Sequence, residues 1–457
     1  MNDVMEKLVA LCKRRGFVFP GSELYGGLNG TWDLGPLGVL LAKNVKGEWW
    51  KSVVERREDV VGLDSSILHH PKVWEASGHV ASFTDPLIEC KMCHERFRED
   101  HKKQIEEHAK THKDVTNYSS SEAKPSREVS SRQARTITDS IWTDVKQFNL
   151  MFKTYVGPID NEENKTYLRP ETAQGIFINF KNVLDSTRIK IPFGIAQIGK
   201  GFRNEITTGN FLFRVREFEM MELEFFVKPG TDKEWHEKWK EARLAWYLSL
   251  GINKENIKLI DLPKEDIAHY SKGTSEIWYN WPFMEWGELE GIANRGDYDL
   301  SQHAKHSGKD LSYLDQEAKE KFVPYVIEPS VGVGRAMLAF LIDAYAEDGE
   351  RVVLKLHPKL APYKVAVFPL LGNKPDIIAK AQEVYADLKL SMPTMFDDRG
   401  NIGKRYLAQD EIGTPWCVTI DFQTLEDDTV TVRDRDTTKQ DRVKIDALTE
   451  FFIEKLG

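Results

Sequence analysis

The sequence predicts an α+β fold, in which a large unit built on an antiparallel sheet with flanking helices precedes a smaller α/β domain. Three observations support this prediction. The stretch 202–226, FRNEITTGNFLFRVREFEMMELEFF, has the pattern of two strands around a turn. The stretch 36–55 has apolar residues at helical spacing. From about residue 361, short apolar strands alternate with helices, which is typical of a compact α/β domain.

Length and composition indicate a globular protein of several domains. The chain has 457 residues, of which 41% are hydrophobic and 30% charged. Its net charge of -9 excludes a polycation, so any contact with nucleic acid must come from local basic patches. The four cysteines are too few for a disulfide framework, which favours a reducing, cytoplasmic location. We expect no signal peptide, membrane span or membrane partner, because no long apolar run occurs.

The first hundred residues combine a glycine-rich passage with a long helix. Residues 20–38 predict turns and close backbone approach, and they lack the order of a P-loop. A helix is expected from Pro36, with a broad apolar stripe formed by Leu37, Leu40, Leu41, Val45, Trp49 and Val53. A β-branched and apolar strand, 60–68, follows and stops before Pro71. The stripe fits either a helix packed on a sheet edge or a dimer interface.

Cys90 and Cys93 form a Cys-x-x-Cys pair, which is half of a zinc knuckle. No second pair follows. The histidines that could complete a site lie in a charged helical stretch and have no standard spacing; they are His94, His101, His108 and His112. We therefore do not expect zinc. Residues 114–135 are rich in Ser, Lys, Arg and Glu and predict a flexible part of a charged insertion, 99–140.

The hairpin 202–226 would place charges of both signs around an aromatic ring. Since side chains alternate along a strand, Arg203 and Glu205 share one face of the first strand, in phase with Gln197. One face of the second strand would carry Arg216, Phe218, Met220, Glu222 and Glu224. Such a surface suits a ligand with a planar base, phosphates and a cationic end. The alternative is a solvated strand face with weak ion pairs.

Two further segments add candidate ligand contacts. Arg169, Pro170 and Glu171 end a strand just before a helix that Thr172 can cap, which is a common place for a ligand contact. In the strand region 278–299, alternation puts Glu288 and Glu290 on one face. Glu288 therefore joins the inward carboxylate candidates.

Arg335 opens a helix that is apolar all round, directly after the glycines at 332 and 334. These glycines let the backbone pass close to a ligand. A buried arginine is costly unless it is paired. The partner is expected to be an anionic ligand or the face of a base, or else one of the glutamates named above, in a buried salt bridge.

The C-terminal domain carries basic and aromatic residues in loops and at strand ends. They are Arg399, Lys404, Arg405, Arg433 and Arg435, with Tyr406 and Trp416 nearby. Interleaved in this way, such residues suit unpaired RNA bases.

Taken in order, the helix–strand–proline segment, FRNE…REF, and GVGR before a buried helix resemble the three motifs of class II aminoacyl-tRNA synthetases. The passages GGLNGTWDLGPLG, SGH at 77–79, RPETAQG, FRVREFEMMELEFF and EPSVGVGR are similar to those of glycyl-tRNA synthetases of the homodimeric type. The resemblance covers nearly the whole chain. It implies a catalytic domain in two parts, 1–98 and 141–357, around the insertion 99–140, followed by an anticodon-binding domain, 358–457.

The resemblance implies an ATP site formed by Arg203, Asn204, Glu205, Phe213, Arg214, Val215, Arg216, Glu217, Phe218, Glu288, Leu289, Gly332, Val333, Gly334 and Arg335. Its catalytic arginines would be Arg203 on the α-phosphate, Arg216 on the γ-phosphate and Arg335 against the nucleotide. Glu205 would bind the adenine amino group, and Phe218 would stack on adenine. Pro71 matches a proline at the dimer interface.

The resemblance also implies a glycine site formed by Arg98, Glu171, Phe218, Glu219, Met220, Met221, Glu222, Glu328, Pro329, Ser330, Val331 and Gly332. Glu171 and Glu222, with Ser330, would hold the ammonium group and crowd the α-carbon. Because excluding a larger side chain sterically is easier than rejecting a smaller one, no editing domain is expected.

The implied activity joins glycine to tRNA(Gly) through glycyl-adenylate in a cytoplasmic homodimer. Positioning and charge neutralisation would carry the rate, so arginines, ATP and Mg²⁺ are needed and a nucleophile is not. Mg²⁺ would bridge phosphates, with Glu288 or Glu328 as possible ligands. Many relatives carry a second Cys-x-x-Cys pair, which this chain lacks, so the resemblance does not imply zinc here.

Two alternatives remain at this point. One is a class II synthetase for serine, threonine, proline or histidine, against which the acidic, serine-containing pocket and RPETAQG argue. The other is a synthetase-like subunit that binds nucleic acid without activating an amino acid. Such subunits lose the motif arginines, whereas this sequence keeps Arg203, Arg216 and Arg335, together with Glu205.

Overall fold

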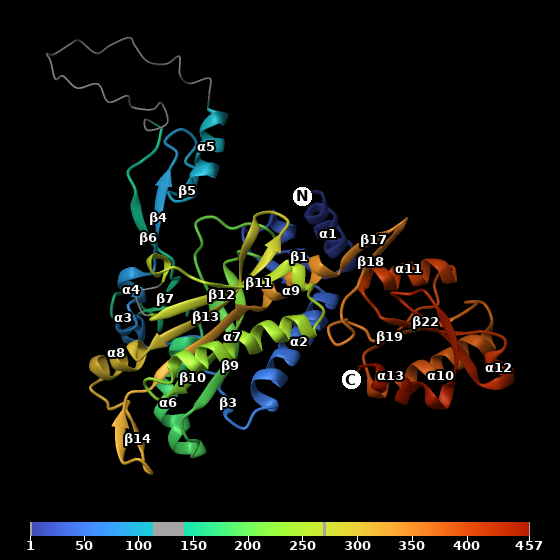
Figure 1. The fold of residues 1–457 in the computed structure, drawn as a ribbon. Helices are drawn as coiled ribbons and strands as arrows, with labels where there is room; N and C mark the ends of the chain where they lie inside the picture. The colour runs from blue at the N-terminus through green and yellow to red at the C-terminus, as the bar shows by residue number, and fades with distance from the viewer. Residues whose placement is uncertain (1, 113–140, 268–270, 457) are drawn as a thin grey trace, which may run out of the picture.

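A seven-stranded sheet forms the centre of the computed structural model, which describes residues 2–112, 141–267 and 271–456 (Figure 1). The strand order is β11-β12-β13-β16-β10-β9-β3. The bounds are β3 Val60–Gly62, β9 Phe193–Phe202, β10 Glu217–Val227, β11 Ile257–Asp261, β12 Gly273–Trp281, β13 Glu285–Gly296 and β16 Tyr325–Gly332. All neighbours are antiparallel except β3 and β9. The predicted antiparallel sheet is confirmed.

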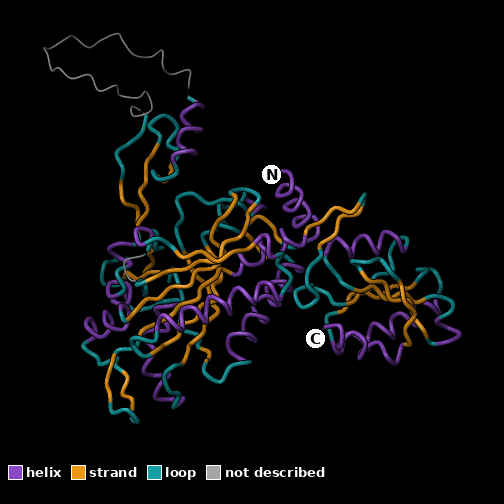
Figure 2. The backbone as a smooth tube through the Cα atoms, in the orientation of Figure 1, coloured by secondary structure: helices purple, strands orange, loops and turns teal. Residues whose placement is uncertain are grey.

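Helices cover both faces of this sheet (Figures 1 and 2). Apolar side chains of α1, α2, α7 and α9 form the largest core on one face, and α6 packs with α8 on the other. Strand β10 serves both, since Leu223 and Phe225 belong to the first core and Phe226 to the second. The bounds are α1 Asn2–Arg15, α2 Pro36–Trp50, α6 Ala173–Thr187, α7 Asp232–Ser249, α8 Tyr298–Ser307 and α9 Val333–Ala344.

The helix predicted from Pro36 is α2, continued by a π-helical turn at Lys51–Glu55. Five residues of its predicted stripe are buried in the core of this chain, where α2 packs on α9; they are Leu37, Leu41, Val45, Trp49 and Val53. Packing within this chain therefore explains the apolar stripe, so the stripe no longer supports a dimer interface. Formation of a dimer stays a prediction. The strand predicted at 60–68 is shorter, because only β3 pairs with the sheet. Pro71 opens α3, Pro71–Ala76.

The predicted hairpin exists, with a longer connection than expected. Strands β9 and β10 pair so that Glu222 lies opposite Gln197, as the alternation predicts. Residues 203–216 form a loop, so the expectation that Arg203, Glu205 and Arg216 lie on strand faces is wrong. Backbone hydrogen bonds of this loop reach other parts of the chain: Arg216 N donates to Gly30 O at 2.8 Å, and Asn204 N donates to Leu150 O at 2.7 Å.

A small unit projects from the main sheet (Figure 1). It consists of a three-stranded sheet, ordered β5-β4-β6, and a helix; the bounds are β4 Thr84–Glu89, β5 Arg96–Arg98, β6 Lys146–Asn149 and α5 Lys102–Thr111. The flexible segment predicted at 114–135 lies outside the described residues.

Short elements complete the larger unit. The strands are β1 Val18–Pro20, β2 Trp32–Leu34, β7 Lys153–Tyr155, β8 Lys165–Tyr167, β14 Tyr313–Asp315, β15 Glu320–Phe322, β17 Tyr345–Asp348 and β18 Arg351–Leu354. The helical turns are α4 His79–Ser82 and the 3₁₀ segments Glu23–Tyr25, Lys254–Asn256 and Lys264–Asp266.

The C-terminal part is an α/β domain, as the alternation of strands and helices predicts. Its sheet has the order β20-β19-β21-β22-β23, with β19 parallel to β20 and β21. The bounds are β19 Val365–Pro369, α10 Pro375–Ser391, β20 Thr394–Phe396, α11 Ile402–Ile412, β21 Trp416–Ile420, α12 Thr424–Asp427, β22 Thr429–Asp434, β23 Gln440–Lys444, a 3₁₀ turn Ile445–Ala447 and α13 Leu448–Leu456. Among the described residues, no helix combines the length and apolar character needed to cross a membrane.

Candidate active site

A cavity of about 490 Å³ opens over β10, β13 and β16, and its size suits a small-molecule ligand. Most of the predicted site residues line it: Arg98, Glu171, Arg203, Glu205, Phe213, Arg214, Val215, Phe218, Met220, Glu222, Glu288, Leu289, Glu328, Ser330, Val331, Gly332, Gly334 and Arg335. Residues from the projection, the 203–216 loop, three strands and the start of α9 therefore meet at one place.

Seven predicted residues do not line the cavity: Asn204, Arg216, Glu217, Glu219, Met221, Pro329 and Val333. Strand alternation explains several of them. Glu219 points to the opposite face of β10, where Lys46 of α2 binds it at 2.9 Å. Met221 and Val333 belong to the core formed with α1, α2, α7 and α9. A prediction made by continuous ranges includes such residues, because it ignores the two faces of a strand.

Glu222 lies on the floor of the cavity and is 1% exposed. Its Oε2 accepts hydrogen bonds from the backbone N–H, at 2.6 Å, and from the hydroxyl of Thr172. Its Oε1 accepts a 2.8 Å bond from Ser330 Oγ. The predicted side-chain cap by Thr172 is thus wrong: the hydroxyl binds Glu222, whose carboxylate caps the start of α6 instead. Burial and the charge of Glu171 raise the pKa of Glu222.

Glu171 lies beside it, at the start of α6. Its Oε2 is 3.3 Å from His79 Nε2, and its Oε1 accepts a 3.0 Å bond from Gln174 Nε2. Ser77 Oγ lies 2.8 Å from His79 Nδ1 and orients the ring. Burial opposes ionisation of Glu171, but His79 and the Gln174 hydrogen bond hold its pKa well below the usual range. These contacts therefore favour the ionised form of Glu171.

Two more carboxyl groups surround this floor. Burial raises the pKa of Glu328 to about 8. Arg295 opposes this shift, and the nearby Glu222 and Glu171 add to it. Arg295 Nη1 binds Glu328 Oε2 at 2.5 Å. Glu224 is fully buried, and burial together with Glu328 raises its pKa well above the usual value. An excess of buried carboxylates over cations fits a cationic ligand.

Aromatic rings and an arginine form the opposite side. The Arg203 guanidinium lies 5.4 Å from the ring centroids of both Phe83 and Phe218. A side chain at position 201 would clash with the Phe218 ring, because a Cβ there would lie 2.8 Å from Cε2. Gly201 therefore leaves room for the Phe218 ring, which lines the cavity and is of a kind that a planar ligand can stack on. Burial also raises the pKa of the nearby Glu205, although the charges of Arg214 and Arg203 oppose this shift.

Arg335 has a partner within the chain. Its Nη1 is 3.0 Å from Glu288 Oε2, and its guanidinium lies 4.5 Å from the Phe213 centroid. Glu288 is 46% exposed, so this pair faces the cavity. The prediction that Glu288 and Glu290 share a face is wrong, because a bulge at Leu289 interrupts the alternation. Glu290 instead lies in the core and binds Arg243.

Arg216 and Arg98 are held by the chain itself. Arg216 donates to the carbonyls of Asn29 and Glu205, which ties the glycine-rich passage to the 203–216 loop. Arg214 lines the cavity in its place. Arg98 extends from β5 to Asp85, at 2.8 Å, and to Asp100. It reaches the edge of the cavity from the projecting unit.

Sequence reasoning missed His79, Arg295 and Glu224 as members of the site. SGH at 77–79 was visible only as part of a resemblance. Arg295 gave no separate signal, because its partners Asp299 and Glu328 come together only in the fold. Glu224 was placed on the correct face by alternation but received no role.

The structure also corrects the predicted RNA surface of the C-terminal domain. Arg405 is 2% exposed and donates to the carbonyls of Pro369 and Gly400. Arg433 binds the buried Asp410 through both Nη atoms, and Arg435 donates to the carbonyls of Leu356 and Gly413; Trp416 is in the core. Of the five basic residues proposed, only Arg399 and Lys404 are exposed. The other three hold the domain together.

Outside the cavity, the structure brings four predicted metal-ligand candidates together. The ligand atoms of Cys90, Cys93, His108 and His112 lie within 4.8 Å of one another. His94 instead binds Glu89. The expectation that the histidines lack a standard spacing is wrong, since Cys-x₂-Cys-x₁₄-His-x₃-His is a known ligand pattern.

Two family models match the chain: "tRNA synthetase class II core domain (G, H, P, S and T)" over residues 152–344 and "Anticodon binding domain" over residues 364–455. Such a core joined to such a domain defines a class II aminoacyl-tRNA synthetase. A relative from Thermobifida fusca, called glycine–tRNA ligase, is 55% identical over 100% of this chain and 99% of its own. Relatives of the same name from Cutibacterium acnes and Streptomyces coelicolor are 52% and 53% identical, over 100% and 99% of this chain and 97% and 99% of theirs. The chain belongs to the glycine–tRNA ligase family.

Proposed function

We propose that this enzyme joins glycine to tRNA(Gly) in two steps, and that the cavity over β10, β13 and β16 binds both glycine and ATP. Family membership supports the reaction. The observation that carries the site assignment is its polarity: buried carboxylates form the floor, and arginines with aromatic rings form the other side.

Glycine would bind on the carboxylate floor. Glu222 and the ionised Glu171 attract the ammonium group, and Ser330 and Thr172 fix the orientation of Glu222. Met220 and the chain at 328–332 limit the space around the α-carbon. This small, acidic end favours glycine over the serine, threonine, proline or histidine alternatives. Arg98, at the edge, would face the glycine carboxylate.

ATP would bind along the opposite side. Adenine stacks on the Phe218 ring, and Glu205 accepts a hydrogen bond from the adenine amino group. Arg203 neutralises the α-phosphate, and Arg335 contacts the nucleotide from the start of α9. A cation from the 203–216 loop, Arg216 or the cavity-lining Arg214, takes the γ-phosphate.

In the first step, a carboxylate oxygen of glycine attacks the α-phosphorus of ATP. A new O–P bond forms, the bond to the bridging oxygen breaks, and pyrophosphate leaves. Arg203 opposes the charge that develops on the α-phosphate. In the second step, the terminal ribose hydroxyl of tRNA attacks the glycyl carbonyl carbon and gives up its proton to solvent, and AMP leaves with the electron pair of the broken acyl–oxygen bond. Both steps need alignment of bound groups more than covalent help from the protein.

Class II synthetases generally use Mg²⁺ with ATP, and the donor set here fits it in part. Glu288 has a half-exposed carboxylate on the cavity, which suits a hydrated cation. Glu328 is buried and bound to Arg295, so it is the poorer of the two ligands. When bound, Mg²⁺ neutralises phosphate charge.

The remaining assignments concern the whole molecule. We propose catalytic parts at 1–98 and 141–357, an insertion at 99–140 and an anticodon-binding domain at 358–457. We also propose a cytoplasmic homodimer. The cytoplasmic assignment is supported by the four free cysteines.

ATP–pyrophosphate exchange with each amino acid tests the proposal. Glycine should drive exchange, and serine, threonine, proline and histidine should not. Exchange driven by serine and not by glycine would overturn the glycine assignment. A Glu222→Gln variant keeps the size of the side chain, so a raised glycine KM at an unchanged ATP KM would locate glycine on the floor.

A further inference from the structure

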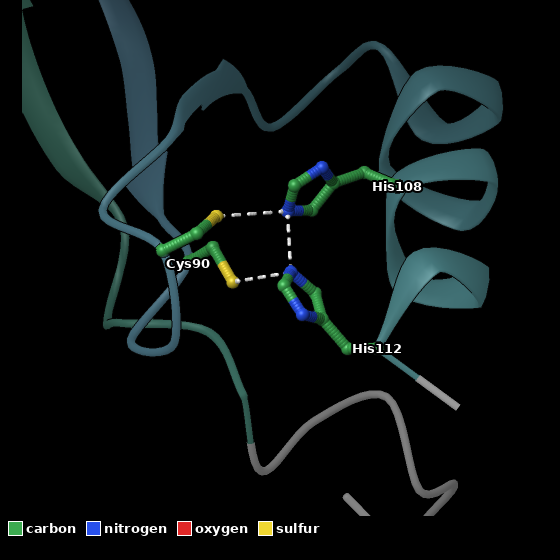
Figure 3. A group of neighbouring side chains, drawn as sticks. Cys90, His108 and His112 are labelled. Carbon is green, nitrogen blue, oxygen red and sulfur yellow. Dashed lines mark hydrogen bonds between the residues drawn. The ribbon is translucent and has the colours of Figure 1, made fainter. Parts of the chain in front are cut away.

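Four side chains in the projecting unit point toward a single centre, away from the proposed glycine and ATP site. Cys90 and Cys93 lie in the turn between β4 and β5, His108 lies in the last turn of α5, and His112 directly follows that helix. Figure 3 shows the two imidazole rings extending from α5 toward the sulfur atoms. Cys90 Sγ is 3.6 Å from His112 Nε2, and Cys93 Sγ is 3.3 Å from His108 Nε2. The two Nε2 atoms are 3.1 Å apart.

Pairwise hydrogen bonds do not account for this arrangement. An imidazole nitrogen offers one N–H or one lone pair, directed along the ring plane. Here each Nε2 contacts both a sulfur and the other Nε2. Tetrahedral zinc, with Zn–S of about 2.3 Å and Zn–N of about 2.0–2.1 Å, places sulfur and nitrogen about 3.6 Å apart and two nitrogens about 3.3 Å apart. The observed separations match those of four ligands around one ion.

The surroundings also resemble a metal site. His108 Nδ1, on the far side of the ring, lies 2.8 Å from Glu95 Oε2. A carboxylate that holds the second nitrogen of a ligating histidine is typical of zinc centres, because it fixes the tautomer and ring orientation. The turn itself is fixed, since Cys90 N donates to Glu95 O and His94 N to Cys90 O, each at 2.8 Å.

Among its described residues, the projecting unit has only a small apolar core. Its described core contains three buried apolar residues, Ile88, Cys90 and Trp142, with a few half-buried neighbours. A unit of this size buries too little apolar surface to fold firmly alone, and metals or disulfides usually compensate. A metal would join the β4–β5 turn to α5.

We propose that Cys90, Cys93, His108 and His112 bind one structural Zn²⁺. Two thiolates and two imidazoles in a closed tetrahedral set favour zinc and leave no position open for catalysis. The ion would fix the turn that leads directly into β5, and thus the position of Arg98 at the edge of the cavity. This second effect rests on the proposed function, whereas metal binding does not.

Metal content is the first test. The wild-type chain, produced in zinc-containing medium and purified without chelator, should hold one zinc per chain by mass spectrometry of the metal. Cys93→Ser and His108→Asn should lose it. His94→Asn is the matched control, because His94 lies in the same turn, is 77% exposed and binds Glu89 instead. Wild-type zinc no higher than in Cys93→Ser would overturn the proposal.

A second measurement does not depend on the variants folding. Wild-type protein stripped of zinc and loaded with Co²⁺ should show the strong visible bands of a tetrahedral thiolate site. Absence of these bands, or a mass showing that Cys90 and Cys93 form a disulfide in freshly purified protein, would contradict the site. Glu95→Gln should keep the bands and weaken metal affinity about 10–100-fold.

Kinetics test the effect on Arg98 separately. Zinc removal should raise the glycine KM while the ATP KM changes little, and added zinc should restore it. If the purified protein contains zinc but its removal leaves the glycine KM unchanged, the metal site stands and the proposed positioning of Arg98 is wrong. Absence of glycine-dependent ATP–pyrophosphate exchange in the zinc-loaded wild type would instead count against the proposed function.

Discussion

The arginines of the cavity and those of the C-terminal domain differ in what satisfies their charge. Arg405 and Arg433 are buried, and their donors bind carbonyls or Asp410 of the same chain. Among the described residues, the Arg203 side chain donates one hydrogen bond, from Nε to Pro170 O, and its guanidinium otherwise lies between two rings. Arg335 shares one half-exposed carboxylate. An arginine that is buried, with both Nη groups bound by the chain, supports the fold, and an accessible arginine with Nη donors left over can bind a ligand.

Arg203→Ala gives the largest expected effect. Removing a charge that stabilises the transition state should lower kcat/KM in glycine-dependent exchange about 10²–10³-fold, with little change in the thermal midpoint. Arg399→Ala is the control, since that side chain is 88% exposed in the C-terminal domain. If Arg203→Ala leaves exchange unaffected, the proposed difference between ligand-binding arginines of the cavity and structural arginines of the C-terminal domain is wrong.

Arg433→Ala should have the opposite profile. Asp410 is fully buried and would keep only Arg351, so breaking the pair should cost about 3 kcal/mol of stability. Thermal unfolding should shift downward, while exchange at 25 °C, which does not involve this domain, should persist. A variant with unchanged stability and weakened tRNA binding would restore the RNA-contact interpretation.

Arg214 and Arg216 test the comparison within one loop. Arg214 lines the cavity, whereas Arg216 donates to two carbonyls. A charge-assisted hydrogen bond to phosphate contributes about 1.5–3 kcal/mol, so Arg214→Ala should raise the ATP KM about tenfold or more. Arg216→Ala should mainly lower the thermal midpoint. The reverse pattern would show that Arg216 leaves its carbonyls to bind the γ-phosphate.

Carboxyl groups allow a smaller, pH-dependent test. With its pKa raised to about 8, Glu328 holds a proton at pH 7. The glycine ammonium favours the ionised form, so binding should release up to one proton, and affinity should increase as the pH rises toward 8. Calorimetry in two buffers of different ionisation enthalpy measures this release, and Glu328→Gln should abolish it. Proton uptake in the wild type would exclude this arrangement of charges.

Periodicity and motif order predicted the sheet, the helix from Pro36 and the C-terminal domain, because those features depend on local spacing. The pocket face of β10 was also predictable, since Phe218, Met220 and Glu222 alternate strictly. A bulge at Leu289 escaped prediction, because it shifts the register by one residue with no mark in the sequence.

Burial of charged groups could not be predicted either. Nothing in the local sequence separates Arg433, bound to an aspartate 23 residues away, from the exposed Arg399. The Cys₂His₂ cluster is a different case, because the spacing of its residues in the sequence already matches a known zinc-ligand pattern.

Strand β10 has a consequence for how this family can change over time. It is paired on both sides, with β9 and β16, and its two faces serve unrelated purposes. Deleting one residue before Phe218 would turn Glu219, Met221 and Leu223 toward the cavity and drive Glu222 and Glu224 into the core formed with α1, α2, α7 and α9. Lineages can therefore exchange single residues here, but insertions and deletions within β10 should be eliminated by selection.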